Sequence, residues 1–164
     1  MDPALQELVA RSFHPPQARG IPLNIHSYGP EEIAEVLDSL LTTQVTMGKK
    51  VRAFEHAFAA YCGAKEGIMV NSGSSADLLA LAALTNPALK DRLHPGDEVI
   101  TPAVTWSTTV FSILNAGLLP HLVDVGEDFL LDIEQLKEAI GPRTRAIMPV
   151  HLLGNPCNMK AIED

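Results

Sequence analysis

Hydrophobic residues recur at helical spacing in the first third of the chain. The spacing predicts an amphipathic helix over residues 2–13, with Asp2 as its N-cap. A second helix is predicted to begin at Pro30, and a third to cover residues 50–61 and to stop at Gly63. Three amphipathic helices are therefore expected before the first strand.

From residue 67 onward, apolar runs of strand length alternate with stretches of helical periodicity. Strands are predicted over residues 67–71, 98–101, 119–125 and 146–151, and helices over residues 75–84, 107–115 and 133–140, with another helix opening at Met159. Such alternation, with strands that are almost entirely apolar, is typical of a mainly parallel sheet covered by helices on both faces. The predicted fold class is therefore α/β, and the helix still open at the last residue indicates a fragment.

Composition and charge argue against nucleic acid as a partner. The 20 acidic and 12 basic residues give a net charge of −8, which repels phosphate backbones and anionic membrane surfaces. Residues 99–123 contain no Asp, Glu, Lys or Arg, but Pro102 and Pro120 predict a buried strand, helix and strand there and not a membrane span. Cys62 and Cys157 lack the spacing of a zinc site or a disulfide framework, so we expect reduced thiols in a cytosolic protein without a metal site.

The sequence NSGSSAD, residues 71–77, stands where a predicted strand turns into a predicted helix. Ligands of open α/β sheets bind at such turns, where the first N–H groups of the helix are unpaired and its dipole is positive. Gly73 permits a tight turn, and Ser74 and Ser75 offer hydroxyl groups, so the turn can hold a phosphate. On spacing alone, the alternative that Ser74 or Ser75 merely caps the helix is equally good. The glycines of a P-loop, a dinucleotide fingerprint and a serine hydrolase elbow are absent.

Two aromatic side chains follow the ends of later predicted strands. Trp106, the only tryptophan, can stack on a planar ring, and the alternative for it is packing in the core. His151 can act as a general base or form a wall of a site, and the alternative is that a nearby carbonyl group satisfies it. Both residues are expected at the edge of the sheet where a ligand would bind.

Three longer stretches resemble one known family. The stretches TMGKKVRAFEHAFAAYCGAKEGIMVNSGSSADLLALAAL, PGDEVITPAVTWSTTVFSILNAGLLPHLVDV and IEQLKEAIGPRTRAIMPVHLLGNPCNM resemble the N-terminal part of the DegT/StrS-type sugar aminotransferases, which use pyridoxal phosphate (PLP) on keto sugars attached to nucleotides. The resemblance implies the large domain of a fold-type-I PLP-dependent transferase, truncated, with an N-terminal helix and arm over residues 1–27 and the first portion of the PLP-binding domain over residues 28–164. It also implies a cytoplasmic homodimer with a nucleotide-sugar substrate and active sites at the subunit interface.

The same resemblance implies roles for single residues. The cofactor-binding residues that it implies are Gly73, Ser74, Ser75, the N–H group of Ala76, and Trp106, which falls where the family stacks an aromatic residue on the pyridine ring. The segment Thr46-Met47-Gly48 matches a part of the family that borders the active site. In the family, the catalytic lysine lies beyond the position of residue 164, so the chain as given should lack its covalent catalyst.

A narrower likeness favours one branch of the family. VNSGSSA and LLGNP resemble the nucleotide-sugar 3-dehydrases of deoxysugar and lipopolysaccharide biosynthesis. Those enzymes remove the C3 hydroxyl of a 4-keto-6-deoxy sugar, use pyridoxamine phosphate (PMP) and replace the lysine by histidine. An aminotransferase that uses glutamate as amino donor is the first alternative. A phosphate-binding module without catalysis is the second.

Overall fold

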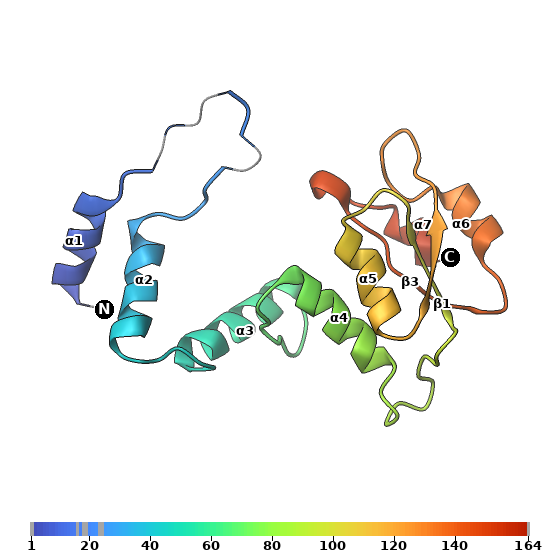
Figure 1. Cartoon of the computed structure of the whole chain (residues 1–164), viewed down its shortest axis with the longest axis horizontal. Coiled ribbons are helices and arrows are strands. Elements are labelled where there is room, and N and C mark those ends of the chain that lie inside the picture. Colours follow the sequence, from blue (N-terminus) through green and yellow to red (C-terminus); the bar gives the residue numbers. More distant parts are fainter. Residues whose placement is uncertain (1, 16, 18–19, 23–24, 164) are drawn as a thin grey trace. The chain divides into compact units, whose positions relative to one another are not determined.

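The computed structural model describes residues 2–15, 17, 20–22 and 25–163, and the chain divides into two compact units, Met1–Met69 and Val70–Asp164 (Figure 1). Described helices make up the regular structure of the first unit, and the described strands all lie in the second. The division falls inside the range 28–164 that the resemblance assigns to one domain. That domain assignment stays a prediction.

The first unit contains helices α1 (Pro3–Ser12), α2 (Pro30–Leu41) and α3 (Lys49–Cys62). Asp2 caps α1, because its carboxylate accepts a hydrogen bond of 2.9 Å from the N–H of Ala4. At the start of α2, the N–H of Gly29 donates to the carboxylate of Glu32 at 2.6 Å. Gly63 ends α3 in the left-handed conformation, with φ of 68°. The three helices predicted for this part of the chain are confirmed.

The second unit alternates helices and strands. Its elements are α4 (Gly73–Leu84), β1 (Glu98–Pro102), α5 (Ser107–Asn115), β2 (Leu119–Val123), α6 (Ile133–Ala139), β3 (Thr144–Ile147), the 3-10 helix η1 (Leu152–Gly154) and α7 (Met159–Glu163). The described strands are all parallel, in the order β2-β1-β3. The uncharged run 99–123 lies in β1, α5 and β2, as predicted. No helix among the described residues is long and apolar enough to cross a membrane.

The core of the second unit lies on both faces of the sheet, because successive side chains of β1 point to opposite faces. Val99 packs with Leu81 of α4 and Ile113 of α5. Ile100, the next residue, packs with Leu136 of α6 on the other face. Figure 1 shows α5 and α6 on opposite sides of the strands. The predicted α/β class, with a parallel sheet between two helical layers, is confirmed.

The strand predicted over residues 67–71 is absent, so this prediction is wrong. The segment has no regular structure, and no described strand pairs with it. Within the first unit it lies on α3: a Cβ on Gly67 would stand 2.8 Å from the carbonyl oxygen of Glu55, and the N–H of Met69 donates to Oε1 of Glu55 at 2.9 Å. Ile68 is 74% exposed. A strand needs a neighbour that pairs with its backbone, and an apolar run alone does not supply one.

The strand β3 ends at Ile147, before the predicted end at His151. The N–H of Met148 still donates to a carbonyl group of β1 at 2.7 Å, and the hydroxyl of Thr101 donates to the carbonyl of Met148 at 3.0 Å. Pro149 comes next, and it has no N–H group to continue the ladder. His151 therefore lies in the loop after the strand.

Candidate functional site

Ser72, which the sequence pattern did not single out, caps α4. Its backbone is extended, and its Oγ accepts a hydrogen bond of 3.2 Å from the N–H of Ser75. The hydroxyl of Ser72 also donates to the hydroxyl of Ser75 at 3.1 Å. The helix therefore begins at Gly73, and the alternative that Ser74 or Ser75 caps it is wrong. A serine directly before the helical stretch is the signal that could have identified this cap.

The first turn of α4 leaves backbone N–H groups available. The N–H of Ala76 donates to the carbonyl of Ser72 at 3.0 Å, which is the first bond of the helix. In the part of the chain that the structure describes, the N–H groups of Gly73 and Ser74 have no hydrogen-bond partner. Such groups, at the positive end of a helix dipole, bind anions. The free donors are therefore those of Gly73 and Ser74, and a phosphate contact of Ala76 stays a prediction.

Gly73 leaves space over these donors, although its backbone freedom is not used. Its φ is not left-handed, so the tight turn expected at this residue is not formed. A Cβ placed on Gly73 would meet no described atom within 4 Å. Ser74 is exposed and Ser75 is half-buried. The turn is therefore open to a ligand that approaches the start of the helix.

Asp77 is the acidic residue of this turn. It is half-buried, burial raises the pKa of its carboxyl group, and it has no hydrogen-bond partner within the described residues. A carboxylate near the start of α4 repels an anion bound there.

Trp106 is exposed, so packing in the core, the alternative for this residue, is wrong. Its side chain is 75% exposed, and it occupies the N-cap position of α5 without a capping hydrogen bond. Tryptophan has no acceptor for the free N–H groups of a helix start, which makes it a poor N-cap. The helices α4 and α5 are neighbours, because they pack through Leu81 and Ile113. The turn that carries Ser72, Ser74 and Ser75, called the serine turn below, stands at the start of α4, and Trp106 stands at the start of α5.

His151 is exposed, and its hydrogen-bond partner differs from the expected carbonyl group. Its Nδ1 accepts a hydrogen bond of 3.0 Å from the backbone N–H of Cys157. Cys157 is a buried free thiol whose Sγ donates to the carbonyl of Val150 at 3.2 Å. The carbonyl alternative for His151 is therefore wrong, because the imidazole accepts a hydrogen bond at this nitrogen.

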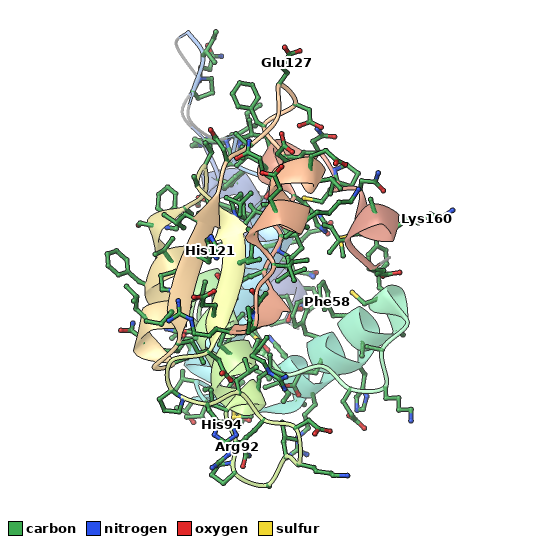
Figure 2. All side chains as sticks on the ribbon, turned by 90° about the vertical axis from the view of Figure 1, so that its right-hand side faces the viewer. Phe58, Arg92, His94, His121, Glu127 and Lys160 are labelled. Carbon is green, nitrogen blue, oxygen red and sulfur yellow. The ribbon has the colours of Figure 1, made fainter. Side chains whose placement is uncertain are left out.

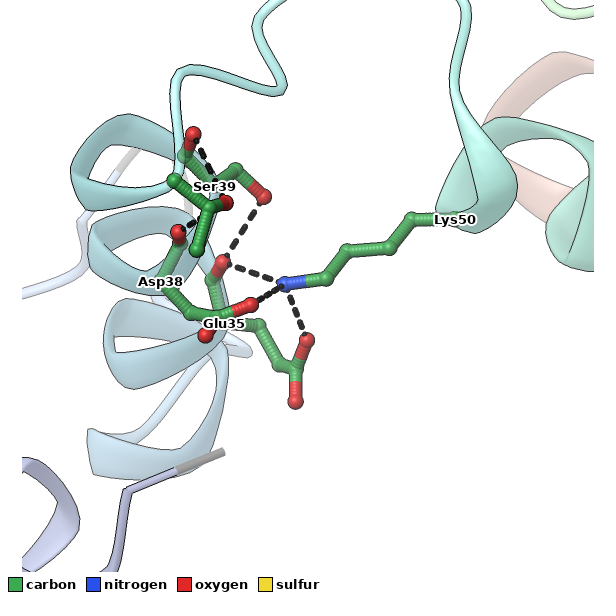
Figure 3. A network of polar contacts seen from close by, with 5 residues as sticks. Glu35, Asp38, Ser39 and Lys50 are labelled. Carbon is green, nitrogen blue, oxygen red and sulfur yellow. Dashed lines mark hydrogen bonds and ion pairs between the residues drawn. The ribbon is translucent and has the colours of Figure 1, made fainter.

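Lys50, which the sequence did not single out, joins the start of α3 to α2 within the first unit (Figure 3). Its Nζ lies 2.6 Å from Oε2 of Glu35 and 2.8 Å from Oδ2 of Asp38, and it donates to the carbonyl of Glu35 at 2.8 Å. The hydrogen bond from Lys50 lowers the pKa of the Asp38 carboxyl, and the bonds to Asp38 and Glu35 raise the pKa of Lys50. The network fixes the end of the segment 46–48, which the resemblance places beside the active site.

The amino end of the sheet carries an ion-pair cluster. Glu98 pairs with Arg143 at 2.5 Å and with Nδ1 of His121 at 3.5 Å, and Figure 2 shows His121 on the strands. Ligands of parallel sheets bind at the opposite, carboxyl end, so we assign these residues a structural role. Among the described residues, no group of three His, Cys, Asp or Glu side chains could hold a metal ion.

A cavity of about 830 Å³ opens in the first unit between α1, α2 and the segment that joins them. Phe13, His26 and Tyr28 line it in edge-to-face contact, with ring centroids 6.2 to 6.4 Å apart. Most of the other lining side chains are apolar. The lining is therefore unsuited to a phosphate, and the serine turn remains the candidate anion site.

Comparisons with known proteins show which enzymes this chain resembles. The chain is 42% identical over 142 residues to GDP-4-keto-6-deoxy-D-mannose 3-dehydratase of Yersinia pseudotuberculosis, an alignment that covers 86% of this chain and 36% of the relative. It is 47% identical over 131 residues to the enzyme of the same name from Escherichia coli O55:H7, covering 79% of this chain and 33% of the relative. The chain thus spans about a third of the length of these relatives.

The fold also matches solved structures, over a similar share of their length. An E. coli GDP-4-keto-6-deoxy-D-mannose-3-dehydratase with bound hydrated PLP superimposes with a TM-score of 0.81 and 41% identity, covering 88% of this chain and 37% of that one. The fold-type-I architecture implied by the sequence is therefore confirmed, for the part of it that this chain spans. Residues 26–164 match the DegT/DnrJ/EryC1/StrS aminotransferase family along their whole length. The chain belongs to this family.

Proposed function

We propose that the whole protein is a PLP- or PMP-dependent enzyme that removes the C3 hydroxyl of a nucleotide-linked 4-keto-6-deoxy sugar. The observation that carries this proposal is the start of α4, where the N–H groups of Gly73 and Ser74 have no partner among the described residues, Ser74 is exposed, and a Cβ on Gly73 would meet no described atom within 4 Å. The similarity to two GDP-4-keto-6-deoxy-D-mannose 3-dehydratases supports this reaction and substrate class.

The serine turn would hold the cofactor phosphate. The N–H groups of Gly73 and Ser74 point from the positive end of α4, where a dianion is stabilised without a cationic side chain. The hydroxyls of Ser74 and Ser75 would donate further hydrogen bonds, and Ser75 is free to do so because its hydroxyl oxygen is the acceptor in its bond with Ser72. The donor set therefore fits a phosphate group.

Trp106 would supply the flat surface for the pyridine ring. An indole that is 75% exposed at a helix start contributes little to the core, and it offers its face to an aromatic ligand. When bound, the cofactor would supply an electron-withdrawing pyridine ring, and its pyridoxamine form would supply the amine that reacts with the C4 keto group of the sugar. The chain's own contribution in this region is to bind the phosphate and to orient the ring.

The alternatives differ in a residue outside this chain. A histidine at the family's lysine position would act as the base for dehydration, whereas a lysine there would serve an aminotransferase with glutamate as amino donor. A phosphate-binding module without catalysis is the remaining alternative. We also propose, from the resemblance, a cytoplasmic homodimer with roles in deoxysugar and lipopolysaccharide biosynthesis.

The test is product analysis with the whole protein. It is incubated with GDP-4-keto-6-deoxy-D-mannose, glutamate and PLP, and the sugar product is identified by mass spectrometry and NMR. We expect a product that has lost the C3 oxygen and gained no nitrogen. A product with an amine at C4 and an intact C3 hydroxyl would establish the aminotransferase, and PLP binding without turnover would establish the binding module.

A further inference from the structure

The imidazole of His151 uses one ring nitrogen inside the protein and leaves the other free. Its Nδ1 lies 3.0 Å from the backbone nitrogen of Cys157. Because a backbone N–H can only donate, Nδ1 carries no proton, and the neutral ring has its proton on Nε2. The side chain is exposed, and within the described residues Nε2 has no hydrogen-bond partner.

The donor that fixes this tautomer is itself held in place. Cys157 is 6% exposed, and its Sγ donates to the carbonyl of Val150 at 3.2 Å. Two hydrogen bonds thus close the loop from Val150 to Cys157. A backbone N–H does not titrate, so the tautomer of His151 depends on no second ionisable side chain. The loop presents a neutral Nε2–H donor to solvent.

His151 and Trp106 follow the carboxyl ends of two neighbouring strands. The strands β1 and β3 are parallel neighbours, with Ile100 opposite Ile147. The chain reaches Trp106 after the carboxyl end of β1 and His151 after the carboxyl end of β3. Open α/β sheets bind their ligands beyond this end. One strand therefore supplies an aromatic face, and the adjacent strand supplies a hydrogen-bond donor.

We propose that His151 contacts the cofactor, donating a hydrogen bond from Nε2–H to the phenolic oxygen of the pyridoxal ring. The inference rests on the proposed function, because it takes the ring to lie on Trp106. A ring stacked on its face presents its edge to neighbouring groups, and the phenolic oxygen is the hydrogen-bond acceptor attached directly to that edge. A neutral donor suits this oxygen, since the bond forms without a change in the charge of the imidazole.

Two variants of His151 separate its two nitrogens. In His151→Asn, the side-chain oxygen can still accept the N–H of Cys157, but no donor remains at the position of Nε2. In His151→Gln, the amide nitrogen reaches the position of Nε2, but the acceptor for Cys157 is lost. For the whole protein with each variant, the dissociation constants of PLP and of its analogue without the phenolic hydroxyl are measured by calorimetry.

We expect the unmodified protein to prefer PLP over the analogue by about three- to tenfold, which is one hydrogen bond's worth of affinity. His151→Asn should abolish this preference, and His151→Gln should retain part of it. Nitrogen-15 NMR of the unliganded protein should show the proton of the His151 ring on Nε2.

Three results would overturn the inference. They are an unchanged preference in His151→Asn, a proton on Nδ1 in the unliganded protein, or a His151→Asn variant that loses affinity only for the nucleotide sugar. Each of these leaves PLP binding at the serine turn intact. Failure of the proposed phosphate site looks different, because the unmodified protein would then bind neither PLP nor the analogue. Failure of the dehydration alone appears in the product analysis and leaves the preference for PLP over the analogue unchanged.

Discussion

At the scale of single residues, the serine turn separates into one residue that builds the helix and two that are available for a ligand. Ser72 supplies the cap, so the hydroxyls of Ser74 and Ser75 are not needed to start α4. Together with the free N–H groups of the first turn, they form a donor set without a positive side chain. Affinity for phosphate and stability of the helix should therefore respond to different serines.

Replacing Ser74 and Ser75 together by alanine should weaken PLP binding by about 2 to 4 kcal/mol, because two hydrogen bonds to a charged group are lost. Equilibrium dialysis of the whole protein measures the affinity. Ser72→Ala is the matched control, and it should lower the free energy of unfolding by about 1 kcal/mol through loss of the N-cap. Unchanged affinity in the double variant would remove the serine hydroxyls from the proposed phosphate site.

Trp106→Ala should reduce PLP affinity by about 0.5 to 1.5 kcal/mol, which is the contribution of an aromatic stacking contact. The free energy of unfolding should change by less than about 0.5 kcal/mol, since the side chain is exposed. Trp106→Phe, which keeps a flat ring, should recover most of the affinity.

The contrasting core variant is Ile113→Ala. Ile113 is 0% exposed, and its truncation should cost about 2 to 5 kcal/mol of stability. The free energy of unfolding of both variants is measured by circular dichroism during urea unfolding. A Trp106→Ala protein that loses stability but keeps its affinity would contradict the stacking role.

At the scale of helices and strands, sequence periodicity was sufficient where an element carries its own signal. The helix over residues 107–115 was predicted with both ends correct, because its helical pattern is flanked by two apolar strands. The strand at residues 67–71 was predicted from a similar apolar run and is absent, because pairing depends on a neighbour that lies elsewhere in the sequence. Local pattern therefore predicts a helix better than it predicts a strand, because it does not show which backbone groups will pair.

The candidate site shows the same limit. That Ser74, Ser75 and Trp106 lie at the starts of helices could be predicted, since the helical patterns over residues 75–84 and 107–115 are visible in the sequence. Their surroundings could not, because the exposure of Trp106 and the bond between His151 and Cys157 are tertiary features. The network of Lys50 escaped prediction for the same reason, with partners 12 and 15 residues away on another helix.

The contact between α2 and α3 should depend on pH through Lys50. The pKa of Asp38 is lowered from its ordinary value of 3.8 by the hydrogen bond from Lys50. The stability that the ionised Asp38 contributes to the fold is therefore complete above pH 3.8 and is lost as the pH falls through the lowered pKa. The pKa of Lys50 is raised from 10.5, so its stabilisation is lost as the pH rises through the raised value. The urea concentration at the midpoint of unfolding should therefore be lower at about pH 3 than at about pH 7.

Lys50→Met should reduce this acid dependence of the urea midpoint. Lys49→Met is the matched control, because it removes the same charge from the neighbouring position, and Lys49 has no ion pair in the part of the chain that the structure describes. Equal effects of the two variants would show that general charge, and not the contact with Asp38, causes the dependence.

At the scale of the whole molecule, much apolar surface is exposed in both units. Ile68 is 74% exposed in the first unit, and Phe111 and Leu153 are 57% and 98% exposed in the second. Exposed apolar side chains of this size are candidates for burial in an interface. Leu153 also has a left-handed backbone with φ of 54°, a strained conformation for a residue with a side chain. These features are consistent with the proposed homodimer.

The single tryptophan has a practical consequence for spectroscopy. Trp106 is the chain's only indole, and it is 75% exposed. Its fluorescence should already be that of an indole in water, so unfolding will hardly change the emission. A chromophore that stacks on it will quench the emission directly. Fluorescence is therefore a poor probe of the folding of this protein and a built-in, label-free probe of its ligand.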